Sequence, residues 1–119
     1  MKDVPISIAK TVGGGICVAA EDGNKVHDAI RAEIEKGNRV VISFSGITRL
    51  TTAFLNAAVG QLYGTYSDEH VRKHLAPPEN AEAWQLNRLK LVVDRAKAFF
   101  RDPVSVKSAL DKATGHDDE

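Results

Sequence analysis

Residues 39–63 have the sequence RVVISFSGITRLTTAFLNAAVGQLY, and this stretch decides the fold. Its first part, residues 39–45, is β-branched and aromatic and too short for a helix, which predicts a central β-strand. The loop that follows ends in Thr51 and Thr52, and either threonine is suited to cap a helix. That helix is predicted over residues 53–63, because apolar side chains recur there at helical spacing. A strand that passes through a polar loop into an amphipathic helix indicates an α/β protein.

Two further strands and a helix are predicted before this stretch. Residues 24–36 place an apolar side chain at every fourth position, as an amphipathic helix does, and Gly37 is suited to end it. Residues 4–10 alternate apolar side chains with others, and residues 16–20 form a short apolar run. The triplet Gly13–Gly15 between them predicts a tight turn and therefore a hairpin of two strands. A strand, a helix and the central strand in succession form a β–α–β unit, whose two strands are parallel.

One helix and a tail are predicted after this stretch. Residues 81–101 form the helix, because Pro77 and Pro78 bar an earlier helix from continuing. The side chains predicted to form its buried stripe are Trp84, Leu86, Leu89, Val93, Ala96 and Phe100. A chain of 119 residues has room for one core, so residues 1–113 are predicted to be a single domain and residues 114–119 a frayed acidic tail.

The composition argues against several classes of function. The 16 lysines and arginines balance the 16 aspartates and glutamates, so the chain carries no net charge that would draw it to nucleic acid or to an anionic membrane. No apolar run reaches the roughly 18 residues that a membrane span needs, and the N-terminus lacks the apolar core of a secretion signal. A cytoplasmic protein is therefore expected. The single cysteine, Cys17, lies in an apolar run and is expected to fill space in the core.

No pattern in the sequence predicts an active site, a cofactor or a metal centre. His70 and His74 would share a helical face, but the sequence around them offers no third ligand. Ser43 lacks the glycine-flanked elbow of a serine nucleophile, and the glycine triplet is not followed by the Lys-Ser/Thr pair of a phosphate-binding loop. The chain is therefore predicted not to be an enzyme and to need no cofactor or metal.

Residues 40–60 resemble the strand, loop and helix at the heart of STAS domains, the fold of anti-sigma factor antagonists. They are similar above all to the STAS-like family of small bacterial proteins without an assigned activity. In that family an apolar strand ending in Phe-Ser-Gly leads to a Thr/Ser loop and a helix that opens with Phe, as Phe44-Ser45-Gly46, Thr51-Thr52 and Phe54 do here. The resemblance implies a small mixed β-sheet with helices packed mainly on one face. It also implies a working surface at the loop before the second helix.

The resemblance implies a regulatory module that binds another protein, of the ATP-binding histidine-kinase-like or anti-sigma type. In anti-sigma factor antagonists an Asp-Ser-Ser-Gly pattern in this loop carries a serine that the partner kinase phosphorylates. Thr52 falls at the place of that serine, although the preceding Asp is missing and Phe54 replaces the Gly. The residues expected to bind the partner are Gly46, Thr48, Arg49, Thr51, Thr52, Phe54 and Asn56, with Thr52 or Thr51 as the phosphorylated residue.

Two alternatives to this function stay open at the level of sequence. The first is a small ligand- or nucleotide-binding protein, or an enzyme, with a pocket near Gly13–Gly15 and Ser43. The second is a homo-oligomer, such as a homodimer, in which Gly60 and Gly64 allow close contact between helices of two copies.

Overall fold

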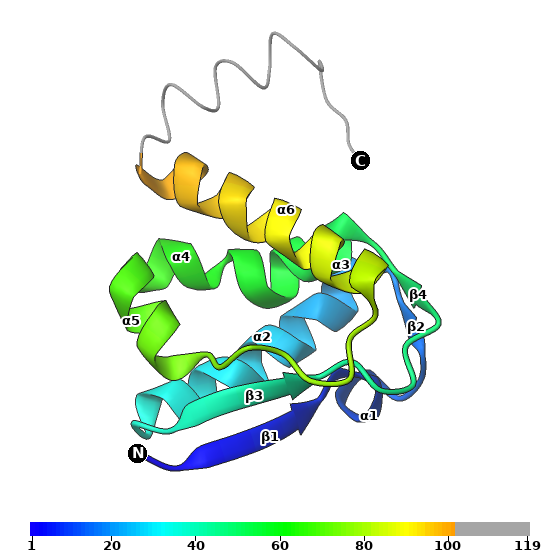
Figure 1. Ribbon diagram of the computed structural model, residues 1–119, viewed down its shortest axis with the longest axis horizontal. Helices are drawn as coiled ribbons and strands as arrows, with labels where there is room; N and C mark the ends of the chain where they lie inside the picture. The colour runs from blue at the N-terminus through cyan, green and yellow to red at the C-terminus, as the bar shows by residue number, and fades with distance from the viewer. Residues whose placement is uncertain (102–119) are drawn as a thin grey trace, which may run out of the picture.

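Two parallel strands lie at the base of the molecule, whose computed structural model describes residues 1–101 (Figure 1). Strand β1 (Asp3–Ser7) pairs in parallel with β3 (Arg39–Ser43), and Ile6 stands opposite Ile42 in the register. Both isoleucines are buried, because the sheet turns alternate side chains toward the core. The strand predicted over residues 39–45 is therefore confirmed over Arg39–Ser43, in a sheet of two strands.

The predicted hairpin is wrong, because the chain leaves β1 in a short helix, α1 (Ile8–Val12). The Ser7 hydroxyl caps this helix by accepting a hydrogen bond from the Lys10 amide at 3.1 Å, and Gly13 ends it with a φ of 96°. Ile8 belongs to the strand predicted over residues 4–10 but begins this helix instead, and Val12 lies one turn later on the same stripe.

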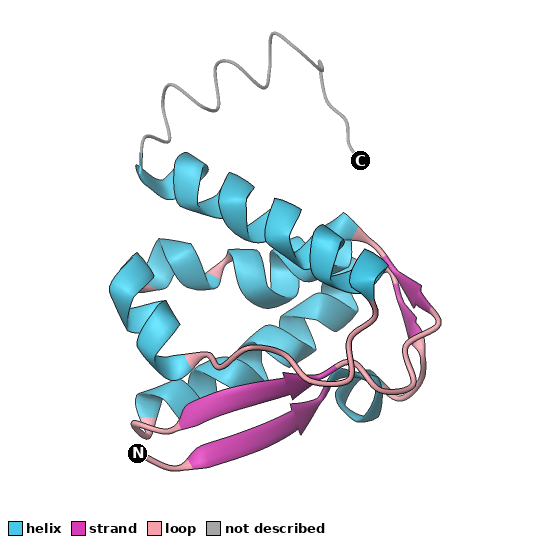
Figure 2. Cartoon of the chain, in the orientation of Figure 1, coloured by secondary structure: helices cyan, strands magenta, loops and turns pink. Residues whose placement is uncertain are grey.

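A second, smaller pair of strands lies at one end of the molecule (Figure 2). Strand β2 (Ile16–Cys17) pairs with β4 (Arg49–Leu50), and this pairing is parallel too. Within residues 1–101 both sheets are thus parallel pairs, and the α/β class is confirmed.

Helix α2 (Ala20–Glu35) runs behind β1 and β3 (Figure 1) and buries Val26, Ile30 and Ile34. These are the side chains of the predicted stripe, although the helix starts four residues earlier than the sequence suggests. Gly37 follows the helix with a φ of 83°, a left-handed conformation that glycine adopts without strain.

The helix predicted over residues 53–63 is one helical run with a wider turn in its middle. It consists of α3 (Thr52–Leu55), the π-helical turn η1 (Asn56–Gly60) and α4 (Leu62–Thr65). The Gln61 amide donates to the carbonyl of Asn56, five residues back, at 3.1 Å. The predicted stripe of this run is fully buried and comprises Phe54, Ala58 and Leu62. Wider turns of this kind often mark places where a helix serves a function.

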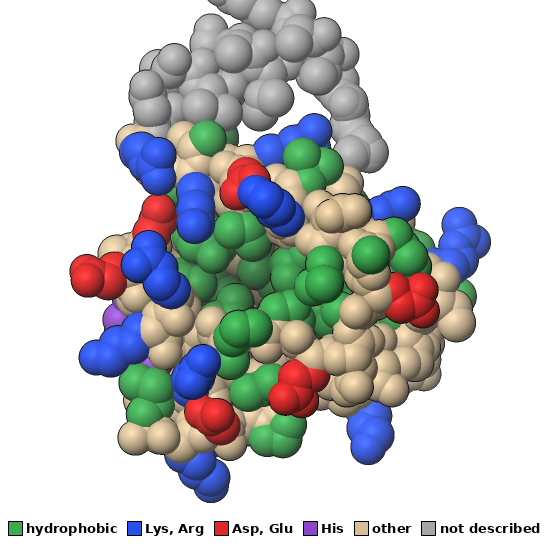
Figure 3. All heavy atoms as spheres, viewed as in Figure 1, with side chains coloured by type: hydrophobic (Ala, Val, Ile, Leu, Met, Phe, Trp, Pro, Cys, Tyr) green, Lys and Arg blue, Asp and Glu red, His purple; other side chains and the backbone are tan. Residues whose placement is uncertain are grey.

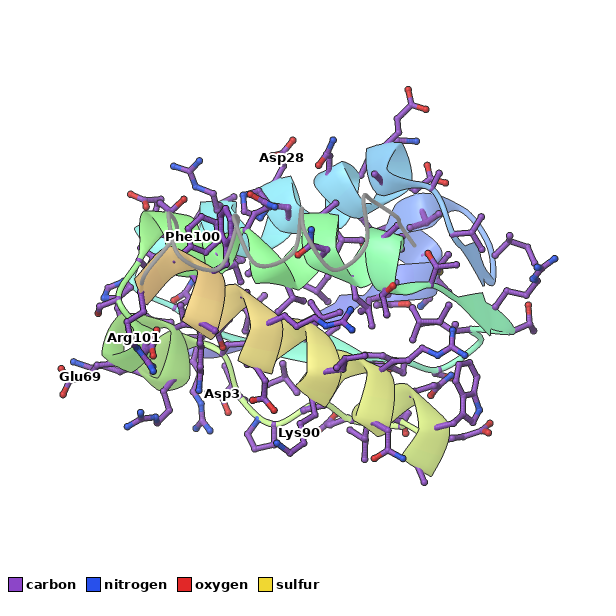
Figure 4. All side chains as sticks on the ribbon, turned by 90° about the horizontal axis from the view of Figure 1, so that it is seen from above. Asp3, Asp28, Glu69, Lys90, Phe100 and Arg101 are labelled. Atoms are coloured by element: carbon purple, nitrogen blue, oxygen red, sulfur yellow. The ribbon has the colours of Figure 1, made fainter. Side chains whose placement is uncertain are left out.

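Helices α5 (Asp68–His74) and α6 (Ala83–Arg101) complete the described part of the chain. The ring of Phe100, near the end of α6 (Figure 4), covers Gly64, where a Cβ atom would stand 2.7 Å from the ring. Gly60 also lies beside α6, where a Cβ atom would stand 3.4 Å from Val92 Cγ1, but the Asn56 side chain of its own helical run would be nearer, at 2.5 Å. The close contact that these two glycines allow is therefore made to another helix of the same chain.

The buried stripe of α6 is rotated relative to the prediction at the start of the helix only, because Ala96 is buried as predicted and Leu89 and Val93 pack partly buried against the core. Gln85, Val92 and Ala96 face the core, whereas Trp84 and Leu86 are 38% and 41% exposed. The Gln85 side-chain oxygen accepts a hydrogen bond from the Glu82 amide at 2.8 Å, so this polar residue is paired although it is buried. Burying Gln85 turns its two apolar neighbours toward the surface.

Most of the buried apolar side chains of residues 1–101 form one cluster. On the face shown in Figure 3, apolar side chains also gather in the hollow between α6 and β3. The apolar side chains of residues 1–101 that pack partly buried against the core include Tyr63, Leu75, Leu89 and Val93. The predicted domain end at residue 113 and the predicted tail at residues 114–119 lie outside the described residues.

Candidate functional site

The junction between β3 and α3, residues 44–51, lies at the surface. Some of its side chains point into the core and others into the solvent. Gly46, Thr48 and Arg49 are exposed, while Ile47 between them and Leu50 after them are buried. Strand β4 causes the last step of this alternation, because successive side chains of a strand point to opposite faces. The junction can therefore serve the core and a binding surface at the same time.

Two predicted partner-binding residues lie elsewhere. Phe54 has no exposed surface and belongs to the core, so its assignment to the binding surface is wrong. It shares a helical stripe with Ala58 and Leu62, and that stripe must face inward for the helix to pack. Asn56 is exposed but lines a different groove, between α2 and the end of α6.

Thr51 caps the helical run and also ties it to the smaller sheet. Its hydroxyl accepts a hydrogen bond from the Phe54 amide at 3.1 Å and donates one to the Val18 carbonyl at 2.8 Å. The predicted N-cap is therefore confirmed, and the hydroxyl proton is engaged. Thr52, the first residue of α3, is half-buried beside it.

A cleft of about 270 Å³ opens between β4 and the start of α6. The residues that line it are Val18, Thr48, Arg49, Leu50, Thr51, Trp84 and Arg88. We call it the β4–α6 cleft. Three of these residues, Thr48, Arg49 and Thr51, were predicted from the sequence, whereas Trp84 and Arg88 were not. They belong to the predicted last helix, and the rotation of its stripe brings them to this surface.

Contacts within the β4–α6 cleft hold Arg88 and Trp84 in place. Arg88 Nη1 donates to the Leu50 carbonyl at 2.5 Å, and its guanidinium lies 5.3 Å from the centre of the Trp84 ring. The indole Nε1 of Trp84 donates to the Glu82 carboxylate at 3.0 Å. An arginine carries five N–H donors, so most of those on Arg88 stay available after the bond to Leu50.

Arg49 and Ile16 extend this surface onto the smaller sheet. They stand opposite each other in the parallel register of β2 and β4, so their side chains share one face. Ile16 is 51% exposed, which is unusual for an isoleucine in a strand. An exposed apolar residue therefore lies beside an exposed positive charge.

The backbone amides of the junction are occupied by β2 and the loop before it. The amides of Thr48 and Arg49 donate to the Gly15 carbonyl at 2.9 and 3.1 Å, and the Thr51 amide donates to the Cys17 carbonyl at 3.1 Å. A Cβ atom on Gly15 would stand 2.3 Å from the Gly46 carbonyl oxygen. The third glycine of the triplet is thus needed for close packing against the junction.

Ser43, beside which the alternative pocket was predicted, has a hydrogen-bonded side chain. The Ser43 hydroxyl accepts a hydrogen bond from the Asn80 side chain at 3.0 Å and another from the Ser45 amide at 3.3 Å. Ser43 therefore acts as an acceptor that fixes the loop after β3.

A larger groove of about 660 Å³ lies between α2, the helical run 52–65 and the end of α6. Its lining includes the polar side chains of Asn24, His27, Asn56, Gln61 and Thr65. Burial lowers the pKa of His27, although a hydrogen bond with the Ala58 backbone opposes this shift. The Nδ1 atom of His27 is buried without a hydrogen-bond partner.

The surroundings of Cys17, and those of the histidine pair His70 and His74, indicate structural roles. Cys17 is fully buried as predicted, and burial together with the Asp22 carboxylate raises the pKa of its thiol. The rings of His70 and His74 lie 4.2 Å apart, and His74 Nδ1 is 3.0 Å from the His70 carbonyl oxygen. Within residues 1–101, no three side chains of the kinds that bind metals gather in one place.

One family model matches the chain. Residues 22–81, half of the chain, match the family described as STAS-like domain of unknown function (DUF4325). The match covers α2 from its third residue onward, β3, the junction, the helical run after it and α5. No curated protein and no solved structure matches the chain significantly. Among the described helices, none is long and apolar enough to cross a membrane.

Proposed function

We propose, from the premise that this chain belongs to the family of STAS-like domains of unknown function, that it is a non-catalytic regulatory module that binds another protein. The binding surface in this proposal is the β4–α6 cleft. The observation that carries it is the pair Trp84 and Arg88, which are held in place beside the exposed Arg49. Tryptophan and arginine are the residues most enriched among those that dominate the energy of protein interfaces.

Fixed side chains favour a binding role for this surface. A side chain that is already ordered loses less conformational entropy when a partner covers it. Trp84 has contacts to both Glu82 and Arg88, so its orientation in the free protein is restricted. The exposed Ile16 adds apolar area on the adjoining sheet.

The partner class is taken from the family likeness. Anti-sigma factor antagonists bind ATP-binding proteins of the histidine-kinase-like class through the loop that corresponds to the junction here. In this proposal the chain binds such a protein in the cytoplasm and acts by occupying it. Neither a cofactor nor a metal is needed for that role.

Phosphorylation of Thr52 is the switch that we propose for this surface. Thr52, the first residue of α3, is the proposed acceptor because it falls at the place of the serine that is phosphorylated in anti-sigma factor antagonists. A phosphate there would add about 1.5 to 2 negative charges at the edge of the cleft, and a bound partner would have to accommodate them. Incubation with the purified partner and Mg-ATP, followed by intact-mass measurement, tests this switch. Absence of the mass of one phosphate contradicts it.

Affinity purification of the tagged chain from its native host tests the docking surface. The informative variant is Trp84→Ala, and Leu86→Ala is the matched control, because it also removes an exposed apolar side chain from α6 but does not line the cleft. We expect the wild type and the control to retain the same partner and Trp84→Ala to lose it. Circular dichroism must show that all three chains are folded. Equal capture by all three chains, or no partner for the wild type, contradicts the proposal.

A second candidate function is the binding of a small molecule in the groove beside His27. The buried Nδ1 atom without a partner favours it, because such atoms in folded proteins normally have a partner. A thermal-shift screen of nucleotides and small metabolites tests this function. A ligand that stabilises the wild type but not His27→Ala supports it, and no shift with any compound contradicts it.

A further inference from the structure

We infer that the β4–α6 cleft recognises an acidic segment of the partner, in which aspartate or glutamate side chains flank an apolar residue. This inference rests on the proposed function and names the chemistry of the partner at the same site. It follows from the charges that line the cleft, from the geometry of Arg88 and from the hydrogen bonds that the backbone amides of the junction already make.

The lining of the cleft is positively charged although the whole chain is neutral. Arg49 and Arg88 both line it, and none of the seven lining residues is acidic. Glu82 lies beside the cleft, where its carboxylate accepts the hydrogen bond of Trp84. Two positive charges on one small surface of a neutral protein favour a partner of opposite charge.

The geometry of Arg88 suits a carboxylate. Its bond to the Leu50 carbonyl and its contact with the Trp84 ring fix the plane of the guanidinium. A guanidinium with a fixed plane can offer two parallel N–H donors to the two oxygens of one carboxylate. The side chain is thus ordered before the partner arrives.

The apolar part of the lining calls for an apolar residue within the same segment. Trp84 is 38% exposed, and Val18 and Leu50 complete the wall of the cleft. A free anion would leave these surfaces in water, whereas a peptide side chain would cover them. The cleft therefore fits a segment that carries both kinds of side chain.

The backbone of the junction disfavours a phosphate group as the natural ligand. Phosphate sites in proteins commonly use a cluster of free backbone amides. Here the amides of Thr48, Arg49 and Thr51 donate to carbonyls of Gly15 and Cys17. An anion in the cleft would therefore be bound by the side chains of the two arginines. These side chains are sufficient to bind a carboxylate.

The experiment uses Trp84 as its reporter, because it is the only tryptophan of the chain and lines the cleft. The full chain is titrated with a short glutamate-rich peptide that has one central leucine, and the tryptophan fluorescence is followed. The comparison peptide has glutamine at each glutamate position, and inorganic phosphate and ATP are titrated separately. We expect saturable binding of the acidic peptide that weakens with added salt, and roughly tenfold weaker binding of the glutamine peptide.

Three variants place the binding in the cleft. Arg49→Gln and Arg88→Lys should each weaken binding of the acidic peptide roughly tenfold, the second because lysine keeps the charge but loses the paired donors. The matched control is Lys90→Gln, which removes a positive charge from the same helix at a residue that does not line the cleft (Figure 4). It should bind as the wild type does.

Several results would overturn the inference. They are equal binding of both peptides, no saturable change with the acidic peptide, unchanged binding in both arginine variants, and tighter binding of phosphate or ATP than of the acidic peptide. Failure of this inference can be distinguished from failure of the proposed function. If the captured partner is lost by Trp84→Ala but kept by Arg49→Gln and at high salt, the docking surface stands and its acidic partner segment does not.

Discussion

The substitution Thr51→Ala is expected to lower the free energy of unfolding by about 2 kcal/mol, because one hydroxyl group makes two hydrogen bonds there. The first bond, from the Phe54 amide, caps the helical run, and loss of such a cap costs about 1 kcal/mol. The second bond, to the Val18 carbonyl, joins the junction to the segment after β2, and a bond of this kind contributes about 1 kcal/mol. The two losses add, because alanine can replace neither bond.

Two further substitutions separate the contributions. Thr51→Ser keeps both the acceptor and the donor, so its stability should stay within about 0.5 kcal/mol of the wild type. Thr51→Asp keeps the cap and gains from a negative charge at a helix N-terminus, but a carboxylate cannot donate to the Val18 carbonyl. It should therefore lose about 1 kcal/mol and lie between serine and alanine.

Urea unfolding at neutral pH, followed by tryptophan fluorescence and by circular dichroism, measures all three differences. The two signals must agree, so that each transition can be treated as two-state. A Thr51→Ala protein within about 0.5 kcal/mol of the wild type would refute the account of the double bond. So would an aspartate variant as unstable as the alanine variant, because the cap would then contribute nothing.

The remaining predictions concern packing and pH. Gly23→Ala should destabilise the protein by about 1 kcal/mol or more despite the helix preference of alanine, because its Cβ atom would stand 2.5 Å from the Phe54 carbonyl oxygen. Gly64→Ala should be nearly neutral, since the ring of Phe100 that it meets can move, and equal losses of melting temperature in the two variants would contradict this difference. His27→Gln should reduce the loss of stability on acidification, measured by urea unfolding between about pH 7 and pH 5. Burial lowers the pKa of His27 below its ordinary value of 6.5, so the unfolded chain takes up the proton first and stability falls with the pH in this window; the same fall in both proteins would disprove the assignment.

The elements that the sequence predicts correctly are those whose signals are local and redundant. Helix α2 combines a repeat of buried Val26, Ile30 and Ile34 with a glycine after its end. The N-cap at Thr51 depends on one side chain and the amide three residues later. Such signals need no knowledge of what the element packs against.

The errors occur where one pattern fits two structures. Ile6 and Ile8 are both buried and stand two apart, as in a strand, but Ile8 begins a helix that Ser7 caps and Gly13 ends. A helix this short offers too few residues for its period to be recognised. Strand β2 is shorter still, and its pairing with β4 depends on a segment more than 30 residues away.

The full site could not be predicted, because its second half depends on the rotation of α6. Leucines and the tryptophan surround Gln85 in the sequence, and a glutamine is normally placed on the exposed side of a helix. Its bond to the Glu82 amide lets it be buried, and that turns Trp84 and Arg88 toward β4. The contact between Arg88 and Leu50 joins residues 38 apart in the chain, and no local sequence pattern predicts it.

The alternation along the junction allows folding and binding to be tested by separate substitutions. Phe54 and Arg49 were both predicted to contact a partner, but Phe54 is fully buried and Arg49 is exposed. Removing the Phe54 ring should cost about 3 to 5 kcal/mol, a large part of the stability of a small domain, so any loss of binding in Phe54→Ala would follow from loss of the fold. Arg49→Gln leaves the core untouched, and its melting temperature should equal that of the wild type. If only Phe54→Ala loses the partner, the junction contributes to binding through the fold alone. If Arg49→Gln loses the partner while fully folded, the partner is recognised at the β4–α6 cleft.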